Sequence, residues 1–385
     1  MITRFAPSPT GENIHIGNLR IAVLNHYHAV KSGGKFILRI EDTLNDRLVP
    51  DCVNKILQCM TDMNMTPDEI FYQSANKKCH LMAADYLVKK GEAYIKDGAT
   101  WIPGNSSSFV DGVYGEKKGS FDDFVIIRSN GEPSFIFANI VDDIYLMSKY
   151  GELTVIRGND HFDNTLKQVH ICKLLNERVP SYYSVSMVCG LDGKPLSKRD
   201  KAGTVESLLD MGIHPEALYK YLLALGNGDC LDKMLKSPVT VDIKKIKSIN
   251  KEYMTKDFVL SKAPYTDKYY DYVKEHIRCI EDLDMFSYLW NRPSLYAPFK
   301  GFTVGCDFST FNRETAQEII NTYINYYSGK FVGADGALMD KKYIYSELRK
   351  CLCGTPYSLD LAIVMEALGV EECIARGLTL YNKEN

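Results

Sequence analysis

The first 91 residues alternate strand-like runs with helical periods, and this order constrains the fold more than any other feature of the chain. Residues 2–6 and 36–40 are short β-rich runs. Apolar residues at helical spacing follow the first run from Ile21 to Val30, and helical periods also occur at 51–63 and 80–90. Because strands that alternate with helices form parallel sheets covered on both faces, we expect half of a Rossmann-like, doubly wound α/β sheet here.

The rest of the chain divides into an insertion, a second half of the sheet and a helical region. Residues 92–133 lack periodicity and are rich in Gly, Ser and Asp, which predicts a short, loop-rich insertion. Strand-like runs at 123–128, 134–137, 153–157 and 182–188, with a helix at 165–175, resume the sheet. Helical periods then dominate, at 216–225, 242–250, 268–280, 313–327, 342–351, 359–368 and 371–377. We expect a Rossmann-like domain in two halves (1–91 and 134–200), the insertion (92–133), a helical region (201–264) and an all-α domain (265–385), with a joint near Ala263 and Pro264.

Composition excludes several classes of protein. A chain of 385 residues is long enough for two or three domains, each with its own core. The absence of a long apolar run and of a signal sequence predicts a cytoplasmic protein without a membrane span. Eleven cysteines, an odd number scattered through apolar periods, predict reduced thiols. Since only Cys351 and Cys353 lie close together in sequence, no structural zinc or other metal is expected.

A proline-rich motif joins the first strand to the first helix. It runs from Arg4 to Gly11 and continues into His15 and Gly17, which the helical period places at a helix entrance. Unpaired N–H groups and the positive end of a helix suit an anion, and a glycine lets a phosphate or a base approach the backbone. Taken alone, such a motif is more often an ordinary turn at a helix entrance.

A second motif, from Leu196 to Arg199, follows a turn and offers Lys198 and Arg199 on a loop. A lysine there can reach a phosphate, although a solvated surface loop is the simpler reading of this motif alone. The net charge of −3 does not indicate a nucleic-acid binder, but one stretch is locally basic. That stretch is either a stripe that binds phosphates or a solvated helical face. Its lysines are Lys233, Lys236, Lys244, Lys245, Lys247, Lys251, Lys256 and Lys262.

Together with residues 36–42, 133–143 and 155–161, the two motifs resemble class I glutamyl-tRNA synthetases in order and spacing. The resemblance covers nearly the whole chain. It implies a glutamate–tRNA ligase that uses ATP with Mg²⁺ to form glutamyl-adenylate and then transfers glutamate to the 3′ end of tRNA(Glu). By the same resemblance, the insertion would contact the acceptor end of tRNA, the lysine-rich helices its inner corner, and the C-terminal helices the anticodon. A monomer is expected.

The resemblance also implies roles for single residues. His15 and Lys198 would be catalytic and flank the triphosphate of ATP. Arg4 and Arg157 can bind the carboxylates of glutamate with paired N–H donors, and Glu41 can bind the ammonium group. The alternative for Glu41 is an acidic pair at a helix N-terminus, and for Arg157 a salt-bridged strand end. The expected ATP-binding residues are Thr10, His15, Gly17, Asp160, His161, Ser197, Lys198 and Arg199, and the expected glutamate-binding residues are Arg4, Ala6, Ser8, Glu41, Phe135, Asn139 and Arg157.

Several positions depart from the family pattern. Three residues, not two, separate Gly11 from His15, and Asn18 stands in place of a second histidine. Pro195 stands where the loop motif has its first lysine, Lys201 stands where a glycine is usual, and Phe135 replaces a tyrosine. The insertion is also short and lacks a cysteine cluster. These departures predict a working but divergent enzyme. Three alternatives stay open: an enzyme that charges tRNA(Gln) as well as or instead of tRNA(Glu), a relative that attaches glutamate to a modified base, and a non-catalytic tRNA-binding paralogue.

Overall fold

The computed structural model describes residues 1–10, 14–43, 49–194, 203–293, 304–306, 308–328, 340–355, 357–378 and 380–382. The chain forms two compact units, Met1–Ile249 and Asn250–Asn385. Ala263 lies in the interior of the second unit, where it packs with Met254, Val259 and Val273. The joint expected near Ala263 and Pro264 is therefore not a break between compact units, because a single core continues through it.

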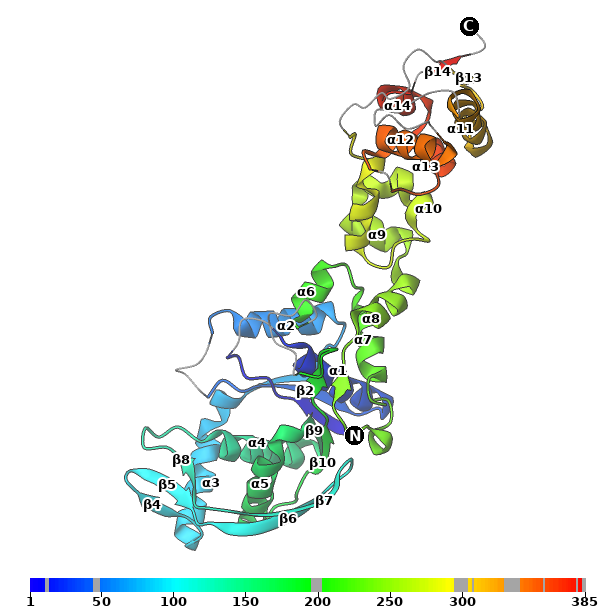
Figure 1. Ribbon diagram of the computed structural model, residues 1–385. Coiled ribbons are helices and arrows are strands. Elements are labelled where there is room, and N and C mark those ends of the chain that lie inside the picture. Colours follow the sequence, from blue (N-terminus) through cyan, green and yellow to red (C-terminus); the bar gives the residue numbers. More distant parts are fainter. Residues whose placement is uncertain are drawn as a thin grey trace. The chain divides into compact units, whose positions relative to one another are not determined.

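A seven-stranded sheet is the centre of the first unit (Figure 1). The chain leaves β1 for β2 and β3 on one side and returns to β9 on the other side of β1. The carboxyl ends of β1 and β9 thus flank a topological switch point, where open parallel sheets bind ligands. Neighbouring strands are parallel except for the β6–β7 pair. In spatial order they are β3 (Glu69–Tyr72), β2 (Lys35–Ile40), β1 (Ile2–Phe5), β9 (Leu153–Gly158), β10 (Ser181–Val185), β6 (Asn105–Asp111) and β7 (Gly115–Phe121).

Helices cover both faces of this sheet, as the sequence predicts. Val155 on β9 packs against Leu146 of α4 and Val169 of α5, whereas the next residue, Ile156, packs against Leu24 of α1. Since adjacent residues of a strand point to opposite faces, α1 lies on one face and α4 and α5 lie on the other. The helices of this region are α1 (Ile16–Lys31), α2 (Cys52–Asp62), α3 (Lys77–Lys90), α4 (Phe135–Tyr150) and α5 (Phe162–Leu175), with 3-10 turns at Gln73–Asn76 and Asn159–His161.

The segment 92–133 is built of strands, so the expectation of a loop-rich module is wrong. β4 (Tyr94–Lys96), β5 (Ala99–Ile102) and β8 (Phe124–Ile127) form an antiparallel sheet, while β6 and β7 extend the main one. Small residues allow close packing here: a Cβ on Gly119 would lie 2.6 Å from Leu166 on α5. Gly119 therefore lies in a strand that packs closely against a helix, which the turn signal alone does not reveal.

The run at 134–137 is also not a strand. It begins α4, with Ser134 as N-cap: its hydroxyl accepts the N–H of Phe137. Phe135, Ile136 and Phe137 have high strand propensity, but the cap and the following helical period decide the outcome.

The first unit is completed by short elements after β10. β11 (Val188–Cys189) pairs in parallel with β12 (Val239–Thr240). The helices are α6 (Val205–Asp210), α7 (Pro215–Ala224) and α8 (Ile243–Asn250), the last of which ends at the boundary between the units, with a 3-10 turn at Leu231–Lys233.

The second unit is mainly helical, and its core is formed by α11, α12 and α13 with the segments around them. Two features differ from the expected all-α region. The predicted helix at 268–280 is largely replaced by 3-10 turns and one short helix, and β13 (Val304–Cys306) pairs in parallel with β14 (Leu380–Asn382). The helices are α9 (Lys256–Lys262), α10 (Tyr270–Val273), α11 (Arg313–Tyr327), α12 (Lys341–Cys353), α13 (Leu361–Leu368) and α14 (Val370–Ala375), with 3-10 segments at Lys251–Tyr253, Pro264–Tyr269 and Ile280–Leu289.

Three general features bear on the predicted class of protein. All eleven cysteines are free thiols. Within the described ranges, no helix combines the length and apolar character that a membrane span requires. The same ranges hold no cluster of three or more His, Cys, Asp or Glu side chains placed to bind a metal ion.

Candidate active site

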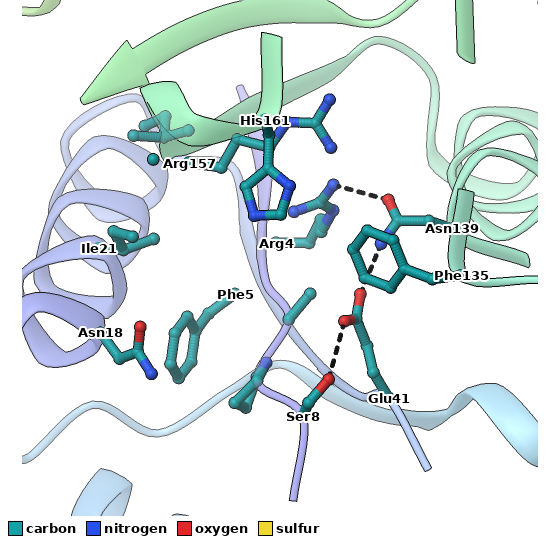
Figure 2. Close-up of a pocket in the computed structure, with 14 residues that line it drawn as sticks. Arg4, Phe5, Ser8, Asn18, Ile21, Glu41, Phe135, Asn139, Arg157 and His161 are labelled. Carbon is teal, nitrogen blue, oxygen red and sulfur yellow. Dashed lines mark hydrogen bonds between the residues drawn. The ribbon is translucent and has the colours of Figure 1, made fainter. Parts of the chain in front are cut away.

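A cavity of about 210 Å³ opens at the carboxyl ends of β1 and β9, at the switch point of the sheet. β1 contributes Arg4 and Phe5, β9 contributes Arg157 and Gly158, and Glu41 follows the end of β2. Figure 2 shows Glu41, Asn139 and Phe135 along one side of this cavity and Asn18 and Ile21 of α1 on the other. All seven residues that the sequence predicts for the glutamate pocket line it: Arg4, Ala6, Ser8, Glu41, Phe135, Asn139 and Arg157.

Arg157 is a buried cation whose hydrogen-bond partners are neutral. Its Nη2 donates to the hydroxyl of Thr165 and to the side-chain carbonyl of Gln168, both at 2.6 Å. Within the described part of the chain, no carboxylate forms an ion pair with it. Burial lowers its pKa to about 10, and the nearby charge of Arg4 acts in the same direction. A buried guanidinium without a counter-ion is costly unless an anion completes the site. The salt-bridged strand end considered as the alternative for Arg157 is not observed among these residues.

Arg4 and Glu41, which line the cavity, belong to a buried network of two arginines and two carboxylates. Asp143 on α4 accepts from Arg4 through both oxygens, at 3.1 Å each, and from Arg39 Nη1 at 2.6 Å. Arg39 Nη2 in turn donates to Glu41 at 3.1 Å. Asn139 links the same groups, since its amide donates to Glu41 at 2.5 Å and its carbonyl accepts from Arg4 at 3.2 Å. These bonds connect β1, β2 and α4 through polar groups that are almost wholly buried.

Glu41 presents one oxygen to this network and keeps the other less engaged. Oε1 accepts from Arg39 and Asn139, whereas Oε2 accepts only a long bond of 3.4 Å from Ser8 among the described residues. Burial raises the pKa of Glu41 above its ordinary value, although Arg39 and Arg4 act against this shift. A cationic group in the cavity would stabilise the ionised carboxylate. Glu41 follows a strand, so it is not part of an acidic pair at a helix N-terminus.

A second cavity, of about 200 Å³, adjoins the first and shares Asn18, Ile21 and Gly158 with it. His15 and Gly17 line it from the start of α1, Asp160 from the 3-10 turn after β9, and Val185 to Val188 from the end of β10 onward. Arg20 lines it as well.

His15 is the N-cap of α1, as the sequence predicts. Its Nδ1 accepts the N–H of Gly17 at 3.0 Å, so in this arrangement the ring proton is on Nε2. The N–H of Ile16 donates to the carbonyl of Gly203 at 3.2 Å. Two N–H groups at this helix end are therefore already paired, and the expectation that unpaired N–H groups receive an anion is wrong for both.

Ser197, Lys198 and Arg199 lie outside the described residues, between Lys194 and Gly203. The segment that follows them is anchored at His15. Besides the bond from Ile16 to Gly203, the N–H of Val205 donates to the carbonyl of Ile14 at 3.1 Å, and His15 and Thr204 form an antiparallel bridge. Lys198 stands only five positions before Gly203 in sequence.

Two predicted ATP-binding residues, His161 and Thr10, do not line the second cavity. His161 lines the first cavity, where it stacks on Phe135 with ring centroids 5.8 Å apart. Burial lowers the pKa of this imidazole, and Arg157 and Arg4 lower it further. Thr10 lines neither cavity.

Sequence reasoning missed several residues that form or support the cavities. Arg20 is wholly buried and donates to the carbonyls of Ser186 and Leu225. Burial lowers its pKa to about 10. A usable signal was the helical spacing of polar residues in an otherwise apolar α4, where Asn139 and Asp143 are four positions apart. The missed residues are Asn18, Arg20, Arg39, Asp143, Thr165 and Gln168.

The lysine-rich stretch is largely exposed but not entirely unpaired. Lys251 lies 3.2 Å from Glu275, and Lys256 lies 2.8 Å from Asp267. These two ion pairs reduce the basic character of that part of the stretch.

The sheet, its switch point and two joined cavities, one cationic and one at a helix start, define a Rossmann-like α/β protein with a ligand site of the nucleotide-binding type. The sequence family described as "tRNA synthetases class I (E and Q), catalytic domain" matches residues 1–100 and 101–255, and the chain belongs to this family.

Curated relatives and solved structures agree with this assignment. The chain is 37% identical to glutamate–tRNA ligase 2 of Neorickettsia sennetsu over 66% of each chain. It is 29% identical to glutamate–tRNA ligase 2 of Wolbachia pipientis subsp. Culex pipiens over 98% of each. A crystal structure of a glutamate tRNA ligase from Elizabethkingia meningosepticum in complex with its amino acid superposes with a TM-score of 0.77 over 97% of each chain, at 20% identity, and thus shares the fold.

Proposed function

We propose that this chain is a glutamate–tRNA ligase whose first cavity binds L-glutamate and whose second cavity, together with Lys198, binds ATP. The proposal combines the family assignment with the charges in the first cavity. ATP as its Mg²⁺ complex is the expected substrate of this family.

The net charge of the first cavity is the observation that favours glutamate as the amino-acid substrate. Among the described residues, the arginine, lysine and carboxylate side chains that line it are Arg4, Arg157 and Glu41, an excess of one positive charge. Behind them, the charges of Arg39 and Asp143 cancel in an ion pair. Asp142 accepts a hydrogen bond from His80 in a separate buried cluster. L-Glutamate carries one ammonium and two carboxylates at neutral pH, a net charge of −1. Glutamate therefore neutralises the cavity, whereas glutamine would leave a buried cation uncompensated.

Each charged group of glutamate has a matching partner in this arrangement. Arg157 has no carboxylate bound to it among the described residues, so it suits one carboxylate of the ligand. Arg4 lines the same cavity and suits the other, and the less engaged oxygen of Glu41 suits the ammonium. Paired donors and a buried counter-charge give strong discrimination without a proofreading site.

On the ATP side, we assign positioning and charge neutralisation to His15 and Lys198. Attack of a carboxylate on the α-phosphate needs little covalent help from the protein, because the reactants must chiefly be aligned and the phosphate charge stabilised. Nε2–H of His15 supplies a donor at the start of α1. A Cβ on Gly17 would approach His15 Nδ1 to 3.2 Å, so glycine leaves room beside the imidazole. We expect Lys198→Ala to lower adenylate formation far more than glutamate binding. A parallel loss of both would contradict this role.

Charging assays test the proposed function. Purified tRNA(Glu) and tRNA(Gln) are each offered with glutamate and with glutamine, together with ATP and Mg²⁺. Glutamate on tRNA(Glu) is the expected product. Glutamate on tRNA(Gln) would identify an enzyme of altered tRNA preference, and tRNA binding without any charging would identify a non-catalytic paralogue and refute the proposal.

A further inference from the structure

Building on the proposed function, we propose that Asp143 is a positioning residue. It orients Arg4 toward a carboxylate of the amino acid and, through Arg39, orients Glu41 toward the ammonium group. Neither Asp143 nor Arg39 lines the cavity. Both act through the residues that do.

Asp143 fixes the orientation of Arg4. Its two oxygens accept hydrogen bonds from Nε and Nη2 of Arg4, so one edge of the guanidinium is occupied. Nη2 is engaged a second time by Asn139. Nη1 is left as the donor without a hydrogen bond among the described residues, on a side chain that lines the cavity. A guanidinium held on one edge presents its remaining donors in a fixed direction, which a planar carboxylate requires.

Arg39 connects Asp143 to Glu41 and so fixes the orientation of Glu41 as well. It is wholly buried and lies between two carboxylates, with Nη1 bonded to Asp143 and Nη2 to Glu41. Glu41 Oε1 is thereby held, and Oε2 is turned toward Ser8 at the cavity. One bridge thus sets the spacing between the cationic and the anionic partner of the ligand.

The charge of Asp143 also keeps the two arginines from competing for Glu41. Burial alone would raise the pKa of Asp143, but Arg4 and Arg39 outweigh burial and hold it below its ordinary value. Without this carboxylate, Arg4 and Arg39 would share Glu41 as their nearest buried anion. Glu41 would then have less charge to offer an ammonium.

The neighbouring residue provides a matched control. Asp142 is as buried as Asp143 and lies on the same helix. It accepts hydrogen bonds from Gln73, Asn76 and His80 and is bonded to neither arginine. A purely structural role of a buried carboxylate on α4 would affect both positions alike.

The experiment measures pyrophosphate exchange on the full chain with tRNA, giving kcat and the KM values for glutamate and ATP. We expect Asp143→Asn to raise KM for glutamate about 10- to 100-fold, the range for a lost charged hydrogen bond, with KM for ATP within about twofold of wild type. Asp143→Glu, which restores the charge, should recover part of the loss. Asp142→Asn should leave KM for glutamate within about twofold.

Two results would overturn the inference: a folded Asp143→Asn protein with wild-type KM for glutamate, or an equal rise in Asp142→Asn. If Asp143→Asn does not fold, Arg39→Lys decides, because it keeps the charge and loses the two-armed bridge. An unchanged KM for glutamate in Arg39→Lys would also overturn it. A wild-type chain without glutamate-dependent exchange would refute the proposed function itself, so the two failures are distinguishable.

Discussion

Two buried arginines on strands that flank β1 differ in their partners, and this difference predicts opposite effects on stability. Arg39 contacts two carboxylates, whereas the described hydrogen-bond partners of Arg157 are neutral. Removing Arg39 leaves buried anions uncompensated, which costs about 3–5 kcal/mol. Removing Arg157 relieves an uncompensated cation. Arg157→Gln should therefore have an unfolding free energy equal to or above that of wild type, while Arg39→Gln should be strongly destabilised.

Activity measurements distinguish Arg157→Gln from a variant that only changes stability. Arg157→Gln should lose about 100-fold in kcat/KM for glutamate, since a buried charge-assisted pair with the substrate is lost. Urea denaturation and pyrophosphate exchange on the same preparations measure both quantities. An Arg157→Gln protein that is destabilised like Arg39→Gln would show that Arg157 serves the fold, contrary to the account.

Phe135 offers a gain-of-contact prediction. It lines the first cavity, which we propose binds glutamate, and stacks on His161. The resemblance implies a tyrosine at this position. Phe135→Tyr adds one hydroxyl without changing the ring. One neutral hydrogen bond contributes about 1 kcal/mol, so KM for glutamate should fall about fivefold with little change in kcat. An increase in KM would indicate that the cavity has no room for the hydroxyl, and Phe137→Tyr, on the wholly buried residue two positions later, is the control for general effects.

At this scale, sequence reasoning finds the residues that touch the cavity better than those behind it. All seven predicted glutamate-pocket residues line one cavity, because motif order carries that information. Arg39 and Asp143 were missed, since a charged residue within a strand or helix gives no sign of its partner across the sheet. Their pairing depends on tertiary contacts between β1, β2 and α4.

At the scale of elements, the start of α1 combines a structural and a chemical role in one side chain. His15 caps the helix through Nδ1, and we assign its Nε2–H to the phosphates. Asparagine is also a good N-cap, so His15→Asn should keep stability within about 0.5 kcal/mol of wild type, while His15→Ala should lose about 1 kcal/mol.

Both His15 variants should lose exchange activity by about 100-fold or more if the imidazole stabilises the transition state. Thermal denaturation and pyrophosphate exchange report on the two roles separately. Wild-type exchange by His15→Asn would show that His15 acts only as a cap.

Helical periodicity predicted the element type correctly at 313–327 and 342–351 but not at 268–280, where 3-10 turns and one short helix form instead. The predicted helices at 313–327 and 342–351 correspond to α11 and α12. The strand predicted at 134–137 was wrong because three apolar residues after Ser134 do not distinguish a strand from the first turn of a helix. The strands of 92–133 were missed because glycine and serine are typical of turns, whereas Gly119 in β7 allows close packing on α5, a tertiary effect.

At the scale of the whole molecule, buried and half-buried histidines predict a pH dependence of stability in the first unit. Burial lowers the pKa of five histidines below the ordinary value of 6.5, and all five lie in Met1–Ile249. The unfolded chain then binds more protons than the folded one near and below pH 6.5, so stability falls as the pH is lowered through this range and rises as it increases. They are His26, His28, His161, His170 and His214.

Hydrogen exchange measured by mass spectrometry, corrected for intrinsic rates, can test this prediction unit by unit. Between about pH 7.5 and about pH 6, protection should decrease in Met1–Ile249. Uniform loss of protection across both units, or none in the first, would contradict it.

The division of the molecule shows the limit of sequence reasoning at this scale. Fading strand signals correctly indicated a mainly helical C-terminal region. The break between units lies after Ile249, whereas the sequence suggested a joint near Ala263 and Pro264. Ala263 and Val259 belong to the core of the second unit, and local sequence does not reveal which core a residue joins.

The proposed function requires that a cavity with one excess positive charge selects an amino acid of net charge −1. Pyrophosphate exchange on the wild-type chain, with ATP, Mg²⁺ and tRNA present and glutamate or glutamine as the variable substrate, tests it most directly. The account predicts exchange with glutamate and a kcat/KM for glutamine lower by at least about 10⁴-fold, the discrimination expected of a site built around buried polar groups. Comparable exchange with both amino acids, or exchange with glutamine alone, would contradict it.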